Sequence, residues 1–208
     1  RCFESEDEIL IEIGGYTACE LYMQYTEFKE VILACDFNSE EQVKAILDMA
    51  ITYLKVDGYQ EKAKNIILAY KNIDKDMNFP LSRIFYDNLV DAKQDRIFIK
   101  EFIESKAGRR QINAFIRYLE KNAISLIDYA DIILELCKNI LQMKSEELQS
   151  QWGIEMEVSK LIISLYDETT NSTISGKKIA DKCLELWDIM FEKQLGSVRE
   201  ISRKLMER

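Results

Sequence analysis

Residues 125–143 read SLIDYADIILELCKNILQM, and the spacing of the polar residues in this stretch is typical of a buried helix. The polar residues recur at steps of three and four, so they form one narrow stripe on a 3.6-residue helix. This stripe consists of Asp128, Asp131, Glu135, Lys138, Asn139 and Gln142. Because apolar residues occupy the rest of the circumference, other helices must cover most of this helix. We therefore predict an interior helix of a helical stack, with Ile133 and Leu136 almost fully buried.

Helix starts are indicated by pairs of residues that resemble capping boxes, in which side chains bind the first backbone N–H groups. These pairs are Ser39 with Gln42, Ser125 with Asp128, and Ser197 with Glu200, the last opening a short final helix. Pro80 suits the first turn of a helix that we expect to end near Leu89 or Val90. We expect the helices to be interrupted at Gly14-Gly15, near Thr26, at Asp57-Gly58, at Ala107-Gly108 and across residues 168–176.

The composition favours an all-α fold. The chain has 208 residues, of which only seven are glycine and one, Pro80, is proline, and no strict strand-like alternation is present. We predict about nine or ten helices arranged as an irregular α–α superhelix, a HEAT- or TPR-like stack of helical hairpins. A short apolar pattern recurs on these helices without a fixed period, so a compact bundle stays an alternative.

The charge is unevenly distributed along the chain. Residues 1–104 carry 12 Lys and Arg against 21 Asp and Glu, a net charge of −9, whereas residues 105–208 carry 16 against 16. An acidic half repels phosphate, which argues against nucleic acid as a partner. No apolar run reaches the roughly 18 residues of a membrane span, so we expect a cytoplasmic protein without a membrane partner. The start at Arg1 leads us to expect a single helical-repeat module, residues 1–208, cut from a larger protein.

Cysteine and histidine usage excludes several kinds of site. The five cysteines are scattered without a C-x-x-C pair, and the chain has no histidine. Zinc-finger spacing is therefore absent, and the cysteines are expected to be buried as small apolar residues. Without histidine, nucleophilic catalysis of the Ser-His or Cys-His type cannot occur within this chain. We predict no enzymatic activity and no cofactor.

Two short segments resemble ligand-binding loops only in part. Asp74, Asp76 and Asn78 match the first ligand positions of an EF-hand, but Phe79 and Phe85 stand where glycine and a bidentate carboxylate are needed. The segment Ser175-Gly176-Lys177-Lys178 resembles the end of a phosphate-binding loop, but it lacks the first glycine, the Ser or Thr after lysine and a preceding strand. No catalytic, cofactor-binding or metal-binding residue is therefore assigned.

Three segments of the C-terminal quarter resemble the helical-repeat tails of large bacterial STAND/NACHT-type ATPases linked to antiphage defence. These segments are LYDET at residues 165–169, IADKCLELWDIMFE at residues 179–192 and GSVRE at residues 196–200. The resemblance implies a sensor or scaffold region that recognises a protein ligand, while another domain of the parent ATPase handles ATP. It assigns no site residue, because no Walker-type residue is present to carry over.

These observations predict a non-enzymatic module that works by protein–protein recognition, as a sensor or scaffold. The alternative is a helical regulatory domain of a nucleic-acid-processing enzyme that touches phosphate through a basic C-terminal face of Lys193, Arg199, Arg203, Lys204 and Arg208. A third reading is an enzyme that uses carboxylates alone. We also expect a weak homodimer through the first two helices, because large apolar residues gather there: Phe3, Ile9, Ile11, Ile13, Tyr16 and Tyr22.

Overall fold

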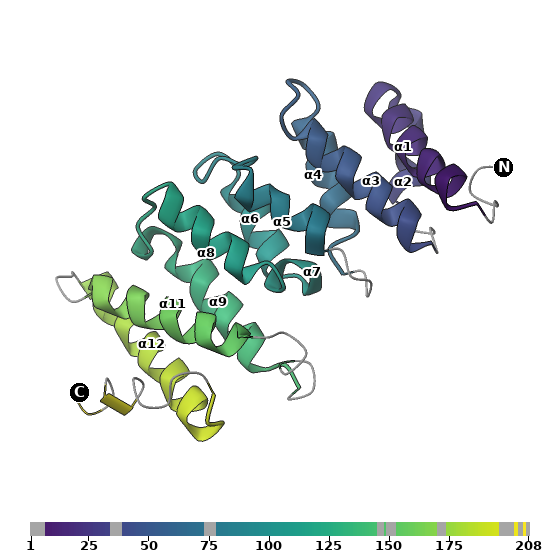
Figure 1. Cartoon of the computed structure of the whole chain (residues 1–208). Helices are drawn as coiled ribbons and strands as arrows, with labels where there is room; N and C mark the ends of the chain where they lie inside the picture. The colour runs from purple at the N-terminus through teal and green to yellow at the C-terminus, as the bar shows by residue number, and fades with distance from the viewer. Residues whose placement is uncertain are drawn as a thin grey trace. The chain divides into compact units, whose positions relative to one another are not determined.

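The computed structural model describes residues 7–33, 39–72, 78–144, 148, 153–169, 174–195, 202–203 and 206 (Figure 1). Within these residues 78% are helical and none lies in a strand, which confirms the predicted all-α class with about the expected number of helices. The chain divides into a first unit, Arg1–Ala114, and a second unit, Phe115–Arg208. The single helical-repeat module over residues 1–208 stays a prediction.

The first unit is built around helix α3. Its elements are α1 (Glu8–Gln24), the 3-10 turn η2 (Thr26–Phe28), α2 (Lys29–Leu33), α3 (Glu40–Tyr53), α4 (Gln60–Ala69), α5 (Asn78–Tyr86), α6 (Arg96–Ile103) and α7 (Lys106–Arg109). Helix α3 packs against α1, α4 and α5, and Figure 1 shows α1 lying alongside it. The apolar residues of α3 recur at helical spacing and are buried, including Val43, Ile46 and Ala50. This helix forms the centre of the first unit's core.

The predicted break at Gly14-Gly15 is wrong, because α1 runs through both glycines. Both are buried where α1 packs against α3. A Cβ atom at position 15 would lie 2.8 Å from the carbonyl oxygen of Gln42 and 2.9 Å from Cβ of Ala45. Gly15 therefore allows the backbones of α1 and α3 to approach closely, which is a second use of glycine besides ending helices.

The predicted end at Ala107-Gly108 is also wrong, because α6 already ends at Ile103 and these two residues lie within α7. The Ser105 hydroxyl donates to the carbonyl of Phe102 at 2.5 Å and accepts from the N–H of Gly108 at 3.1 Å, which joins the two helices. A Cβ atom on Gly108 would overlap the Phe102 carbonyl. The glycine here permits a tight turn between helices.

Several of the other expected boundaries are confirmed. Ser39 is the N-cap of α3, and its hydroxyl accepts a hydrogen bond from the N–H of Gln42 at 3.4 Å. Helix α1 ends before η2, which begins at Thr26, and Gly58 has a φ of 84° in the turn between α3 and α4. Pro80 lies in the first turn of α5, as predicted, but α5 ends at Tyr86, earlier than expected.

Three helices end on a non-glycine residue in the left-handed conformation. Helix α5 is followed by Asn88 at φ 55°, α8 (Ile112–Lys121) by Ala123 at φ 48°, and α12 (Ile174–Glu192) by Gln194 at φ 53°. In each case the next residue's N–H returns to a carbonyl five residues back: Leu89 to Ile84 at 3.0 Å, Ile124 to Leu119 at 3.0 Å and Leu195 to Met190 at 2.9 Å. This is the Schellman arrangement, which usually employs glycine. Because no glycine marks this helix end in the sequence, α5 was predicted to extend to Leu89 or Val90 instead of ending at Tyr86.

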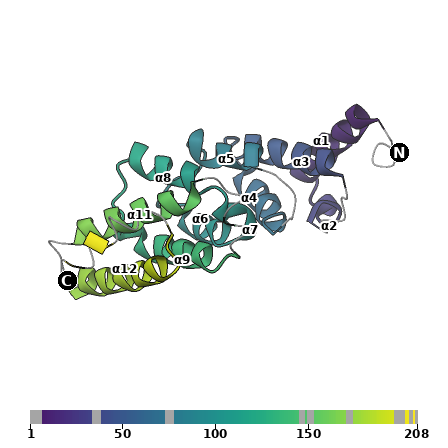
Figure 2. The ribbon, with the colours of Figure 1, turned by 60° about the horizontal axis from the view of Figure 1, so that its bottom comes forward.

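The second unit has α9 at its centre. It contains most of α8, the 3-10 turn η3 (Ile127–Tyr129), α9 (Ala130–Leu141), α11 (Ile154–Glu168) and α12. Helix α9 packs against both α11 and α12, and Figure 2 shows α9 and α12 side by side. Ile133 and Leu136 are both 0% exposed, as predicted, while the exposed or half-buried residues of α9 belong to the predicted polar stripe. Helix α9 is therefore an interior helix.

The predicted capping box of Ser125 and Asp128 is wrong. Helix α9 begins five residues after Ser125, following η3, and its N-cap Tyr129 makes no side-chain cap. Instead, the Glu168 carboxylate at the end of α11 accepts from the N–H of Ile127 at 2.9 Å and from the Ser125 hydroxyl at 3.5 Å. A carboxylate distant in sequence thus accepts from one backbone N–H at the start of the η3–α9 segment, as the helix dipole favours.

The loop predicted at residues 168–176 is shorter than expected. Helix α11 includes Glu168, and α12 already begins at Ile174, so Ser175 and Gly176 lie in its first turn. Residues 170–173 and the predicted cap of Ser197 with Glu200 lie outside the described residues. In the part of the chain that the structure describes, no helix combines the length and apolarity needed to cross a bilayer.

Candidate functional site

The two segments that partly resemble ligand-binding loops, residues 74–78 and 175–178, do not form a binding site among the described residues. Asp74 and Asp76 lie outside the described residues, and Asn78 begins α5. The segment of residues 175–178 is part of the first turn of α12. Among the described residues, no group of three or more Cys, Asp and Glu side chains is arranged to hold a metal ion.

The described cysteines are buried in helix interfaces. Burial raises the pKa of Cys19 and that of Cys183 to about 12, and it also raises the pKa of Cys137. Because the thiolate is the nucleophilic form, these protonated thiols are unreactive at neutral pH. They act as small apolar residues, as predicted for them.

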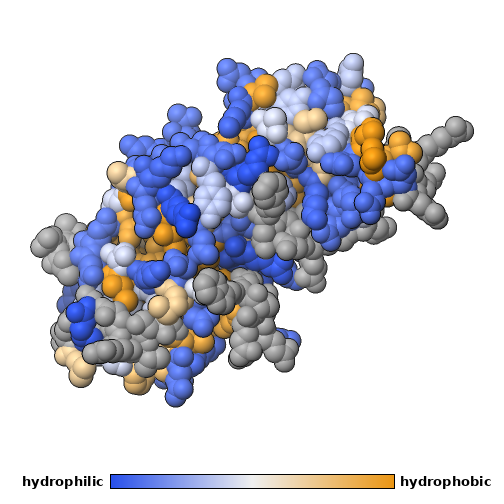
Figure 3. Space-filling model, in the orientation of Figure 1, coloured by the Kyte–Doolittle hydropathy of each residue, from blue (hydrophilic) through white to orange (hydrophobic). Residues whose placement is uncertain are grey.

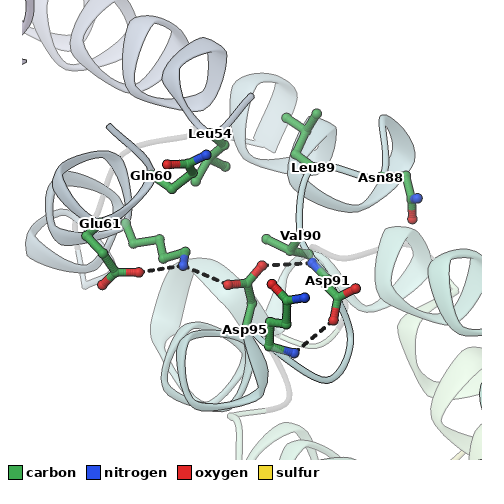
Figure 4. A pocket seen from close by; sticks show the side chains of 10 residues that line it. Leu54, Gln60, Glu61, Asn88, Leu89, Val90, Asp91 and Asp95 are labelled. Carbon is green, nitrogen blue, oxygen red and sulfur yellow. Dashed lines mark hydrogen bonds and ion pairs between the residues drawn. The ribbon is translucent and has the colours of Figure 1, made fainter. Parts of the chain in front are cut away.

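A polar cleft of about 500 Å³ lies in the first unit (Figure 4). The end of α3, the start of α4 and the segment between α5 and α6 contribute its walls. Its lining consists of Leu54, Gln60, Glu61, Lys64, Asn88, Leu89, Val90, Asp91, Gln94 and Asp95. Leu54, Leu89 and Val90 are the buried apolar residues of this lining, whereas its charged residues are exposed or half-buried.

Hydrogen bonds hold the charged groups of the cleft in place. The Lys64 ammonium contacts the carboxylates of Glu61 at 2.7 Å and Asp95 at 2.6 Å. Asp95 also accepts from the N–H of Asp91 at 2.7 Å, and Asp91 accepts from the N–H groups of Lys93 and Gln94, both at 2.8 Å. In Figure 4, dashed lines mark the ion pairs that the labelled carboxylates of Glu61 and Asp95 make with this ammonium. The segment after α5 is thereby fastened to α4.

The electrostatics of the cleft favour its charged groups. Desolvation acts to lower the pKa of Lys64, but its hydrogen bonds to Asp95 and Glu61 outweigh that effect, and the pKa is raised. The backbone N–H groups of Gln94 and Lys93 lower the pKa of Asp91. Lys64 therefore offers no neutral amine and Asp91 no acidic proton at neutral pH, which makes them unsuited to nucleophilic or acid catalysis. With three carboxylates and one ammonium, the cleft favours cationic groups.

Sequence reasoning did not identify this cleft. Lys64 and Asp95, which form its central ion pair, are separated by 31 positions in the sequence. The one local signal is Asp91 followed by Lys93 and Gln94, since aspartate commonly accepts from the N–H groups two and three residues on.

A second candidate is an apolar strip on the outer face of α1, formed by Ile9, Leu10 and Ile13. These side chains are 66%, 42% and 47% exposed. Successive helix residues are turned by about 100°, so the three lie within one arc, opposite the face that buries Ala18 and Tyr22. In the space-filling view, apolar surface is visible at the α1 end of the first unit (Figure 3). We refer to these three residues as the outer strip.

The predicted basic surface is only partly described. The Lys193 ammonium donates to the carbonyl of Leu141 at 2.5 Å, so this lysine caps the C-terminal end of α9. Arg203 is exposed, whereas Arg199, Lys204 and Arg208 lie outside the described residues. Lys193 is thus engaged within the second unit instead of extending a phosphate-binding face.

Comparisons of the chain with protein-family models, with curated proteins and with solved structures find no match. Functional inference for this chain therefore depends on its own residues.

Proposed function

We propose that this chain is a non-enzymatic protein–protein recognition module, working in the cytoplasm as a sensor or scaffold part of a larger multidomain protein. The observation that supports this proposal is the exposed outer strip of α1. Burial of a large aliphatic side chain contributes about 1.5–3 kcal/mol, so Ile9, Leu10 and Ile13 together offer a useful binding energy. They are also neighbours on one helix face, at spacings of one, three and four residues.

An exposed apolar residue without apolar neighbours, Ile97, contrasts with the grouped residues of the outer strip. Ile97 on α6 is 82% exposed, but the residues three and four positions away in the sequence are all polar: Lys93 and Gln94 before the helix, and Lys100 and Glu101 within it. Isolated exposed apolar side chains are common on proteins and require no explanation, whereas grouped ones indicate an interaction site. Ile97 is therefore a matched control for Leu10.

Site-specific photocrosslinking in the parent protein tests the proposal. A benzoylphenylalanine at position 10 is expected to crosslink to one discrete protein, or to another domain of its own polypeptide, identified by mass spectrometry. The same group at position 97 is expected to give no such product. If the two positions give the same products, or if position 10 gives none, the outer strip is not a recognition surface.

We further propose that the parent protein is a bacterial STAND/NACHT-type ATPase of antiphage defence, with this chain in its sensor tail. The resemblance of residues 165–169, 179–192 and 196–200 supports this proposal. A nucleotide-binding domain encoded elsewhere in the parent gene is the expected finding, and a parent without one would contradict it.

A further inference from the structure

Acidic residues border the outer strip along one side and at its N-terminal end. At about 100° per residue, Glu8 and Glu12 form a row beside Ile9 and Ile13, and Asp7 is the N-cap that precedes them. All three are exposed, and the sequence of α1 contains no lysine or arginine. The first turns of α1 therefore present an apolar centre with a negative rim.

We propose that the outer strip binds an amphipathic helix of a partner protein in which Lys or Arg side chains flank the apolar face. This inference rests on the proposed recognition function and names the chemistry of the partner. Charge complementarity between two surfaces selects partners and disfavours those with like charge. A partner helix with basic flanks would place its charges against Glu8, Glu12 and Asp7 while its apolar face covers the strip.

The shape of the surface favours a helix over an extended strand. An α-helix directs its backbone N–H and C=O groups along its axis, and the N–H groups of Ile9 and Ile11 already donate to Asp7, so the side of α1 offers no edge to a strand. Ile9 and Ile13 form a ridge at a spacing of four residues, which fits the groove between side chains of a crossing helix. Thr17 is the next residue on this ridge, and being polar it ends the strip. The contact is therefore confined to about two turns.

The acidic rim disfavours a second copy of α1 as the occupant. A symmetric pair of α1 helices would bring Glu8, Glu12 and Asp7 of both copies to the same interface, where like charges repel. The predicted homodimer would be weak for this reason. The same charges would strengthen binding to a basic helix.

Two synthetic helical peptides test the inference. Both have the same leucine face, but one carries lysine at the flanking positions and the other carries glutamate. Binding to the full chain is measured by fluorescence anisotropy at low and at physiological salt. We expect the lysine peptide to bind the wild type at least about tenfold more tightly than the glutamate peptide, with affinity falling as salt rises. Equal binding of the two peptides would overturn the inference.

Variants of the chain distinguish apolar binding at the outer strip from non-specific electrostatic attraction of the peptide. Leu10→Ser combined with Ile13→Ser is expected to weaken binding of the lysine peptide about tenfold or more, because the apolar contact is lost. Glu8→Gln combined with Glu12→Gln is expected to reduce the salt dependence, and Ile97→Ser should change neither quantity. Unchanged binding in the double serine variant would place the peptide elsewhere and overturn the inference.

The test distinguishes this inference from the recognition function on which it rests. If neither peptide binds while position 10 still crosslinks to a partner, the strip is a recognition surface and the proposed partner chemistry is wrong. If sedimentation of the chain alone shows a tight dimer that the double serine variant abolishes, the occupant is a second copy and the inference is overturned.

Discussion

The first unit and the second unit bring their helices together by different means. In the first unit, α1 and α3 approach at Gly15, where a Cβ atom would meet the backbone of α3. In the second unit, large side chains fill the space between helices, and Ile133 and Trp187 are both 0% exposed. The centroids of the Trp187 and Tyr166 rings are 4.9 Å apart. Contacts between backbones tolerate no added atoms, whereas contacts between large side chains tolerate no lost volume or added charge.

The two units share the use of charged side chains from one helix to satisfy the end of another. In the first unit, Lys62 of α4 donates to the carbonyls of Tyr22 and Met23 near the end of α1, at 3.1 and 2.7 Å. In the second unit, Lys193 and Glu168 serve the two ends of the η3–α9 segment. Lysine lies at C-terminal ends and glutamate at an N-terminal end, in agreement with the helix dipole.

The largest expected effect is that of a charge in the core of the second unit. Replacing Ile133 with Asp should destabilise the protein by several kcal/mol, because an unpaired charge would be buried among apolar groups. That loss is comparable with the roughly 5–15 kcal/mol total stability of a domain. Urea unfolding followed by circular dichroism measures it. Lys138→Gln on the exposed side of the same helix is the control, with an expected change within about 0.5 kcal/mol. Equal midpoints for the two variants would mean that α9 is not an interior helix.

An added methyl group tests the backbone contact of the first unit. Alanine normally stabilises a helix interior by about 1 kcal/mol relative to glycine, so Gly15→Ala would be stabilising if the position were open. The close contacts with Gln42 and Ala45 reverse this expectation, and we predict a loss of roughly 1–3 kcal/mol.

Thr17→Ala, at an exposed position of the same helix, is the control for Gly15→Ala and should be neutral or slightly stabilising. Thermal unfolding of both variants gives the sign directly. A higher midpoint for the Gly15 variant would show that α1 and α3 can separate without cost.

Features of this fold that depend on residues close together in the sequence could be predicted from it, and features that depend on distant residues could not. The apolar face of α9 and the Ser39 cap are set by residues within a few positions of one another, and both predictions are confirmed. The predicted capping box at Ser125 was wrong because the acceptor at this helix start, Glu168, lies 43 positions away in the sequence. The predicted helix break at Gly15 was wrong because glycine occurs both at helix ends and at close contacts between helices. The residues next to it in the sequence do not show which of these two roles it has.

The two candidate sites differ in the same way, because one depends on residues close in sequence and the other on distant residues. Of the six large apolar residues predicted to form an exposed surface near the start of the chain, the structure exposes Ile9 and Ile13. Ile11 and Tyr16 are half-buried, Phe3 lies outside the described residues, and the prediction is wrong for Tyr22, which is buried in the core. The cleft was missed, since its central ion pair joins Lys64 of α4 to Asp95 beyond α5. Which helix covers which surface is decided by long-range packing that periodicity does not encode.

An intermediate effect is expected at Glu168, the cap shared between α11 and the η3–α9 segment. Glu168→Ala removes the acceptor for the Ile127 N–H and should cost roughly 0.5–2 kcal/mol, the usual value of an N-terminal cap. Glu168→Gln retains an oxygen acceptor and loses only the charge, so its cost should be smaller, about 0.3–1 kcal/mol. Glu185→Ala, on the exposed side of α12, is the control in the same unfolding series. Equal stability of the Ala and Gln variants would indicate that the charge alone matters.

The smallest expected effect is a gain in stability at a helix end, and it compares the two units directly. Ala123 in the second unit and Asn88 in the first occupy equivalent left-handed positions, at φ 48° and 55°. This conformation costs an L-residue such as alanine roughly 1–2 kcal/mol, but asparagine tolerates it much better. Glycine removes the strain but adds about 0.4–1 kcal/mol of entropy cost in the unfolded chain.

The balance of these two terms predicts that Ala123→Gly stabilises the protein by about 0.5–1 kcal/mol. Asn88→Gly should change the stability little, because there is less strain to relieve while the entropy cost is the same. Gln194, at φ 53° after α12, should respond to glycine as Ala123 does, since its side chain is also poorly suited to this conformation. Differential scanning calorimetry resolves such shifts. If Asn88→Gly stabilised the protein as much as Ala123→Gly, backbone strain at these helix ends would not depend on the residue, and the reason given for the difference would be wrong.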